Sequence, residues 1–120
     1  MLKDATGFKA VYIKAGYTDL RYGVNGLASL VLNDFNLNPM DEGAIFLFCG
    51  RRSDRIKALL WEGDGFLLLY KRLEQGRYQW PRKPEDVLKI SEDQLHQLLS
   101  GFSIAQTIPP KEDPAPTYVA

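Results

Sequence analysis

The feature that most constrains the fold of this chain is an uninterrupted apolar run, Ala44–Cys49, which Gly50 ends. The run has the length of a strand and is too short for an ordinary helix. It holds no polar position, so it does not alternate as a strand with one wet face does. Strands of this kind lie inside sheets, and we therefore expect this run in the centre of a sheet.

Other segments rich in β-forming residues predict the remaining strands. We expect a first strand over residues 8–14, then two strands over 54–61 and 66–73, and a short last strand over 77–80 that Pro81 closes. The Asp64-Gly65 pair between the second and third of these suits a tight hairpin turn, because glycine tolerates a positive φ angle. Consecutive hairpins predict an antiparallel meander.

Two amphipathic segments predict helices. Thr18 is placed as the cap of a helix that starts at Asp19. Its apolar residues recur at spacings of three and four, at Leu20, Val24, Leu27, Leu30, Val31 and Phe35. Gly23 and Gly26 each disfavour a helix interior by about 1 kcal/mol relative to alanine. Their presence indicates a close approach to the backbone, by a neighbouring strand or by a partner.

The second helix is short and begins with a capping box. Ser91 would cap it and Gln94 would reach back to the Ser91 backbone. We therefore predict an α+β fold, a small antiparallel β-meander packed against one long amphipathic helix, with a short C-terminal helix. Residues 1–104 of the 120 would form a single compact domain, and the proline-rich residues 105–120 a disordered tail.

Several classes of protein are disfavoured by the composition. The apolar runs are far shorter than the roughly 20 residues that cross a bilayer, and the N-terminus shows no secretory signal. One cysteine, Cys49, cannot form an internal disulfide or a thiolate metal cluster. We expect a cytoplasmic protein without a membrane association.

The residues that usually carry catalysis are sparse. His96 is the one histidine, and no pair of ligands has zinc spacing. Cys49 ends an apolar strand, where a free cysteine is normally inert packing. Asp54, Glu62 and Asp64 are close in sequence, but two are expected in an exposed turn and Asp54 beside arginines. We expect no enzyme, no cofactor and no metal.

Charge is distributed unevenly, although the formal net charge is zero. Residues 51–83 hold nine basic side chains against four acidic ones, and the rest of the chain carries the compensating negative charge. A polyanion responds to such a local field rather than to the overall charge. The candidate nucleic-acid contacts are Arg51, Arg52, Arg55, Lys57, Lys71, Arg72, Arg77 and Arg82.

These cations alternate and are interleaved with aromatic residues. If residues 51–61 form one strand, Arg51, Arg55 and Lys57 share a face with Trp61, opposite Ile56. Cations at this spacing suit a phosphate backbone, and Trp61, Tyr70 and Trp80 could stack on unpaired bases or contact a partner. The same pattern also suits a solvated sheet that protects its edge and caps its core, and composition leaves both interpretations open.

Several sequence blocks in fixed order resemble a known family. They are GYTDLR at 16–21, LFCGRR at 47–52, DRIKAL at 54–59, WEGDGF at 61–66, LYKRLE at 69–74 and QWP at 79–81. The chain is similar over roughly residues 7–104 to the TnpB-type accessory protein, the second reading frame, of the insertion-sequence sixty-six family of bacterial transposable elements.

The resemblance implies a non-catalytic accessory protein for transposition of an insertion sequence, with the element-encoded transposase and a second accessory protein as partners. No active-site residue carries over from the resemblance to this chain. DNA contact through the basic β-face is the favoured role. The alternative is a protein–protein assembly factor that docks on the transposase without direct DNA binding. Sequence does not fix the oligomeric state.

Overall fold

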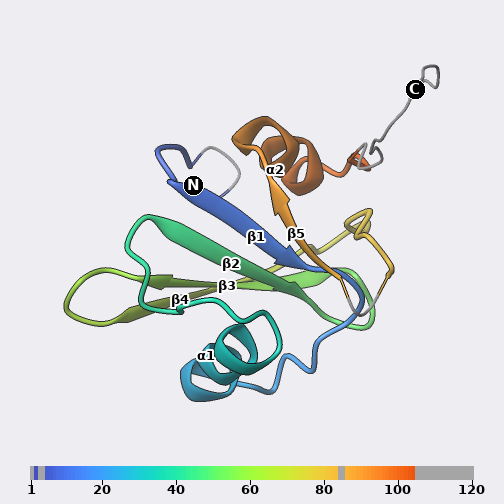
Figure 1. The fold of residues 1–120 in the computed structure, drawn as a ribbon. Helices are drawn as coiled ribbons and strands as arrows, with labels where there is room; N and C mark the ends of the chain where they lie inside the picture. Colours follow the sequence, from blue (N-terminus) through green and yellow to red (C-terminus); the bar gives the residue numbers. More distant parts are fainter. Residues whose placement is uncertain (1, 3–4, 84–85, 105–120) are drawn as a thin grey trace.

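The computed structural model describes residue 2, residues 5–83 and residues 86–104. Within these residues the chain forms one five-stranded sheet with the strand order β4-β3-β2-β1-β5 (Figure 1). The strands are β1 (Ala10–Lys14), β2 (Ala44–Cys49), β3 (Arg55–Trp61), β4 (Phe66–Arg72) and β5 (Val87–Ile90).

The apolar run of residues 44–49 is the middle strand, as predicted. β2 pairs with β1 on one side and β3 on the other, and all six of its residues are buried. Burial on both faces is the physical reason that the run contains no polar residue. The β3–β4 hairpin was also predicted, and its strands are paired from Trp61 opposite Phe66 to Arg55 opposite Arg72.

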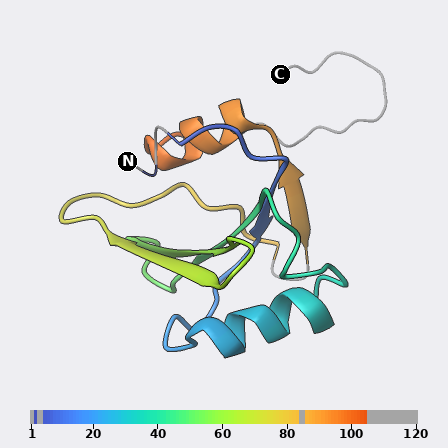
Figure 2. The same cartoon turned by 90° about the vertical axis from the view of Figure 1, so that its left-hand side faces the viewer.

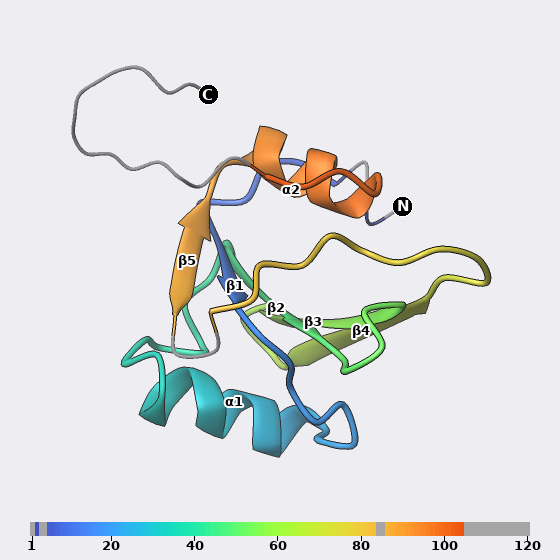
Figure 3. The same ribbon diagram turned by 90° about the vertical axis from the view of Figure 1, so that its right-hand side faces the viewer.

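Two helices cover opposite faces of the sheet (Figures 2 and 3). On one face, Leu27 and Val31 of α1 (Val24–Asn33) pack with Phe46, Phe48 and other residues of the sheet. On the other face, α2 (Glu92–Leu99) packs over a second apolar cluster. Its buried residues are Leu95, Leu98 and Leu99.

The predicted antiparallel meander packed against one long helix is wrong. The sheet is mixed, because β1 and β2 run parallel, with Val11 opposite Ile45. A parallel pair requires the chain to cross over the sheet before it returns, and α1 makes that crossing. Both helices are short, with ten residues in α1 and eight in α2.

The first helix is shorter than its apolar periodicity predicts, because the preceding segment is bound to the end of the sheet. The Thr18 backbone N–H donates to the Cys49 carbonyl at 2.8 Å, which anchors this segment to the end of β2, outside the helix. Thr18 therefore does not cap the helix. Gly23 is the N-cap, without a side-chain cap hydrogen bond, and α1 begins at Val24.

Gly26 has a close neighbour, as its place in a helix suggested, but that neighbour is neither a strand nor a partner. A Cβ atom on Gly26 would lie 3.0 Å from Cγ of the Tyr22 side chain. Gly23 meets nothing within 4 Å. The small residue at position 26 thus accommodates the ring that lies just before the helix.

The predicted last strand over residues 77–80 is also wrong. These residues belong to no strand, and the fifth strand is the later β5, antiparallel to β1. The capping box of α2 is confirmed. The Gln94 backbone N–H donates to Ser91 Oγ, and the Gln94 side chain accepts from the Ser91 backbone. The predicted tail over residues 105–120 lies outside the described residues.

Candidate nucleic-acid interface

An open groove lies at the end of the sheet where the two parallel strands finish. The chain leaves β1 through residues 15–23 and leaves β2 through residues 50–54, and these two loops form part of the groove wall. β3 is antiparallel to β2, so it begins at this end of the sheet. β4 is antiparallel to β3, so it ends there. The groove has a volume of about 1070 Å³. Ligand sites in sheets with parallel strands commonly lie at such carboxyl ends.

A tight turn after β2 presents two arginines to this groove. The Ser53 backbone N–H donates to the Gly50 carbonyl at 3.0 Å, so Arg51 and Arg52 occupy the two central positions of the turn. Both side chains are exposed and line the groove. Neither has an ion pair or a hydrogen bond with another residue in the part of the chain that the structure describes.

The first residues of β3 continue the cationic wall. Arg55 and Lys57 are two residues apart, so they lie on the same face of the sheet, and both line the groove. Lys57 donates to the Tyr22 carbonyl at 3.0 Å and lies 5.9 Å from the centre of the Tyr70 ring. Tyr70 is directly opposite Lys57 on β4 and is 53% exposed. The predicted cations Arg51, Arg55 and Lys57 are therefore together, although 51–54 form a turn rather than part of a strand.

The loop after β1 supplies residues that the sequence prediction missed. Tyr17 and Arg21 line the groove, and Tyr17 is 44% exposed. Gly16, with φ +75°, turns the chain there, and its N–H donates to the Pro81 carbonyl at 2.8 Å. Residues 17–22 hold two tyrosines and one arginine, so the search for aromatic residues near cations that singled out 51–83 could have identified this loop as well.

Five cations and one carboxylate line the groove among the described residues. The carboxylate is Asp19, which accepts from Arg21 at 2.7 Å; these hydrogen bonds lower the pKa of Asp19 to about 2. Beside the groove, hydrogen bonding to Arg55 lowers the pKa of Asp54. Arg21 and Arg55 are therefore partly neutralised, whereas Arg51, Arg52 and Lys57 have no ion pair among the described residues, although the charge of Arg52 also helps to lower the pKa of Asp54.

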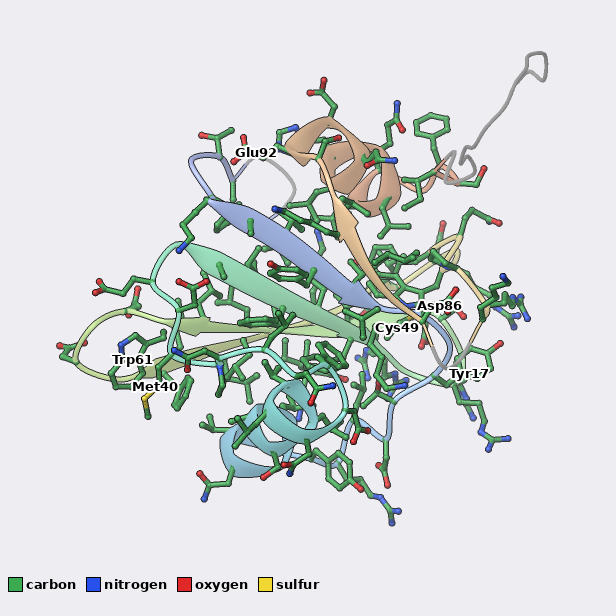
Figure 4. The ribbon with its side chains drawn as sticks, in the orientation of Figure 1. Tyr17, Met40, Cys49, Trp61, Asp86 and Glu92 are labelled. Atoms are coloured by element: carbon green, nitrogen blue, oxygen red, sulfur yellow. The ribbon has the colours of Figure 1, made fainter. Side chains whose placement is uncertain are left out.

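The remaining predicted contact residues lie away from the groove walls. Trp80 is only 5% exposed, and its indole N–H donates to the Lys14 carbonyl at 2.8 Å, so it packs in the core. Trp61 packs edge-on against Phe66 with ring centres 4.9 Å apart. It lies at the opposite end of the sheet from Tyr17 (Figure 4).

The outlying cations have separate environments. Lys71 lies on the face of β4 opposite to Tyr70, and Arg72 pairs with Glu74 at 3.3 Å. Arg77 is exposed in the segment after β4. Arg82 is different, because it donates to the Tyr17 hydroxyl at 3.1 Å and lies 6.0 Å from the centre of that ring. Through Tyr17 it reaches the rim of the groove.

Cys49 and His96, which were considered as a nucleophile and as a metal ligand, have structural environments within the fold. Burial raises the pKa of the Cys49 thiol to about 12, which keeps it protonated. One ring nitrogen of His96 lies 2.9 Å from the Ala5 carbonyl oxygen. Over residues 2, 5–83 and 86–104, no group of three metal-binding side chains occurs. No helix within those ranges is long and apolar enough to cross a membrane.

The fold and the groove define a small mixed-sheet protein with an open, cation-lined and tyrosine-lined binding surface. A family model described as IS66 Orf2 like protein matches residues 9–108, and the chain belongs to this family. Its members are accessory proteins of a bacterial insertion sequence, and the resemblance of the sequence blocks is thereby confirmed.

Two relatives from Sinorhizobium fredii (strain NBRC 101917 / NGR234) are similar along most of their length. Uncharacterized protein y4hO is 39% identical over 109 residues, which are 91% of each chain. Uncharacterized protein y4jC is 34% identical over 84 residues, 70% of this chain and 71% of the relative. No solved structure matches the chain.

Proposed function

We propose that this protein serves transposition of its insertion sequence by contacting DNA through the groove, without catalysing strand transfer itself. The observation that carries this proposal is the convergence of Arg51, Arg52 and Lys57, from a turn and a strand, on one surface without ion-pair partners among the described residues. When such cations bind a phosphate backbone, they release its condensed counterions, and this release favours binding.

The tyrosines of the groove support the same function. Tyr17 and Tyr70 expose ring surface beside cations, and flat rings in a basic groove can stack on unpaired bases. A DNA end with unpaired nucleotides would therefore meet both phosphate-binding and base-stacking groups. Phosphate contact and ring stacking are both insensitive to base identity, so we expect binding with little sequence preference.

Docking on the element's transposase is the second candidate. Tyr17, Tyr22 and Tyr70 are all exposed and lie near the arginines, and tyrosine and arginine are the residue types enriched in protein interfaces. An acidic face of the transposase would then occupy the groove in place of DNA.

The test is a salt titration of DNA binding by the wild type and the double variant Arg51→Gln/Arg52→Gln. A labelled duplex of the element's terminal sequence with a short single-stranded end is the probe. We expect roughly tenfold or greater loss of affinity at low salt in the variant, and a salt dependence of log K that is less steep by about two. Fluorescence anisotropy measures both quantities.

A charge-matched control is Arg77→Gln/Lys89→Gln, since both residues are exposed and neither lines the groove. This control should keep most of the affinity. Equal loss in the two double variants would mean that net charge alone drives binding. Absence of DNA binding at low salt, together with co-elution of wild type but not Arg51→Gln/Arg52→Gln with the transposase, would establish docking instead.

A further inference from the structure

The outer edge of β4 is the longest unpaired strand edge of the sheet. β4 has seven residues and is the outermost strand beside β3, whereas β5 at the other end has four (Figure 3). Among the described residues, β4 pairs with β3 alone. Its outward backbone groups have no backbone hydrogen bond in the described part of the chain.

The residues that offer these outward groups follow from the pairing with β3. Residues of an antiparallel pair alternate between positions that exchange hydrogen bonds and positions that do not. The Leu73 N–H donates to the Asp54 carbonyl at 2.7 Å, and the Glu62 N–H donates to the Gly65 carbonyl at 2.8 Å, which fixes the alternation at both ends. The outward N–H and C=O groups therefore belong to Phe66, Leu68, Tyr70 and Arg72.

This edge lacks the features that usually prevent strand addition. Natural edge strands carry charges, proline or bulges that discourage pairing. Residues 66–70 are Phe-Leu-Leu-Leu-Tyr, with neither charge nor proline, and their regular pairing with β3 shows no bulge. Only Lys71 and Arg72, at the end of β4, are charged.

We propose that a second copy of this chain adds its own β4 to this edge, antiparallel, and that the protein is a two-fold dimer with one continuous sheet. Self-pairing centred on Leu69 uses the whole strand and places residues with outward backbone groups opposite one another, as the hydrogen bonds require. It sets Arg72 opposite Phe66 and Lys71 opposite Leu67 of the second copy, so no like charges face each other.

The pairing also sets Tyr70 opposite Leu68 of the second copy, an aromatic residue beside an aliphatic one. The formal net charge of zero adds no overall repulsion between copies. These two features favour a second copy over a strand of another protein, because the side chains of β4 are compatible with those of an identical antiparallel strand.

The dimer has a consequence for the groove. A two-fold axis perpendicular to the sheet keeps the same face of both copies on the same side. Leu68 and Tyr70 line the groove and belong to the joined strand, so the two grooves would meet across the joint. The dimer itself does not depend on DNA contact, and its test needs no DNA.

The test compares Tyr70→Pro with Tyr70→Val in the full-length chain. Both variants lose the ring, but only proline removes the outward N–H, and the bonds to β3 remain because Tyr70 does not exchange hydrogen bonds with Lys57. Light scattering after gel filtration, over a wide concentration range, should show a wild-type dimer. We expect the dissociation constant of the Tyr70→Pro dimer to be roughly ten- to hundredfold higher than that of the Tyr70→Val dimer.

Charge substitutions at Leu67 test the register. Leu67→Lys would face Lys71 of the second copy and weaken the dimer, whereas Leu67→Glu would strengthen it. Circular dichroism confirms that each variant is folded. A wild type that stays monomeric, or equal dissociation constants for Tyr70→Pro and Tyr70→Val, would overturn the proposal. A monomer that captures the transposase through this edge, and loses it in Tyr70→Pro, would assign the edge to that partner instead.

Discussion

The end of β4 divides the basic, aromatic segment over residues 50–83 into a first half, residues 50–72, and a second half, residues 73–83, which have similar residue types but opposite placement. In the first half, Arg51 and Arg52 stand on a turn and Tyr70 lies exposed on an edge strand, all beside the groove. In the second half, Tyr78 and Trp80 are turned into the core and are at most 5% exposed. Aromatic residues beside cations are thus surface groups in one half and packing groups in the other.

The difference arises from how the two sheet faces are covered. α1 covers its face but leaves the beginning of β3 and the end of β4 open, so polar side chains remain there. α2 covers the other face only in part, and the segment after β4 runs on this side of the sheet (Figure 2). Tyr78 and Trp80 complete that core. The same residue types acquire different roles because one segment lies at an open end and the other over an apolar face.

The largest effect that separates the halves should be on stability, at Trp80. Trp80→Ala removes a buried ring and leaves the Lys14 carbonyl without its indole donor, and we expect a loss of about 3–5 kcal/mol in the free energy of unfolding. Tyr70→Ala in the first half should cost less than about 1 kcal/mol, because that ring is half exposed. Urea unfolding measures both.

The companion variant Trp80→Phe keeps most of the ring and loses the N–H, so its loss should be intermediate. If Trp80→Ala unfolded at the wild-type urea concentration but no longer bound DNA, the assignment of the two halves would have to be exchanged.

Alkaline pH should lower the free energy of unfolding gradually, through two buried residues of the core. Burial raises the pKa of Cys49 from 9.0 to about 12 and that of Tyr78 from 10.0 to about 12. The folded state therefore favours the protonated forms. The stabilisation of the folded state by these two raised pKa values is complete below pH 9 and is lost as the pH rises towards 12.

The measurement is the urea midpoint as a function of pH for the wild type and for Cys49→Ala/Tyr78→Phe. The double variant should show a shallower decline between pH 9 and 12, since it lacks both groups. Tyr78→Phe alone removes a hydroxyl that is buried without a hydrogen-bond partner among the described residues, so its stability at pH 7 should not fall. Parallel pH curves for the two proteins would contradict this account.

The sequence predicted the elements whose signals are local. The buried strand, the β3–β4 hairpin and the capping box at Ser91 each follow from a few neighbouring residues. The parallel pairing of β1 with β2 was missed because nothing in the strands themselves specifies the direction of a distant partner. β5 was missed because four residues, with Lys89 exposed, show too little alternation.

The candidate site was half predictable for the same reason. Arg51, Arg52, Arg55 and Lys57 were found from their density, but the assumption that residues 51–61 form one strand, which put Arg51, Arg55 and Lys57 on one face, was wrong for residues 51–54, since a turn precedes β3. Trp80 is buried in the core, where its indole N–H donates to the carbonyl of Lys14, a residue 66 positions away. Composition does not reveal a contact between residues so far apart in the sequence. It therefore could not distinguish exposed aromatic residues that could stack on bases from aromatic residues that pack in the core.

The smallest effect should come from Asp19, the one carboxylate among the described residues that line the groove, and it tests whether local charge controls DNA binding by the first half. Asp19→Asn releases Arg21 from its ion pair but keeps an oxygen that can accept the Arg21 backbone N–H. We expect DNA affinity to rise about two- to fivefold and the salt dependence to steepen by up to about one. The pair is exposed, so the free energy of unfolding should change little. Asp64→Asn, in the exposed hairpin turn, makes the same charge change outside the groove and should leave affinity nearly unaltered. Equal gains in the two variants would show that the whole molecule's charge, rather than the groove, attracts the DNA.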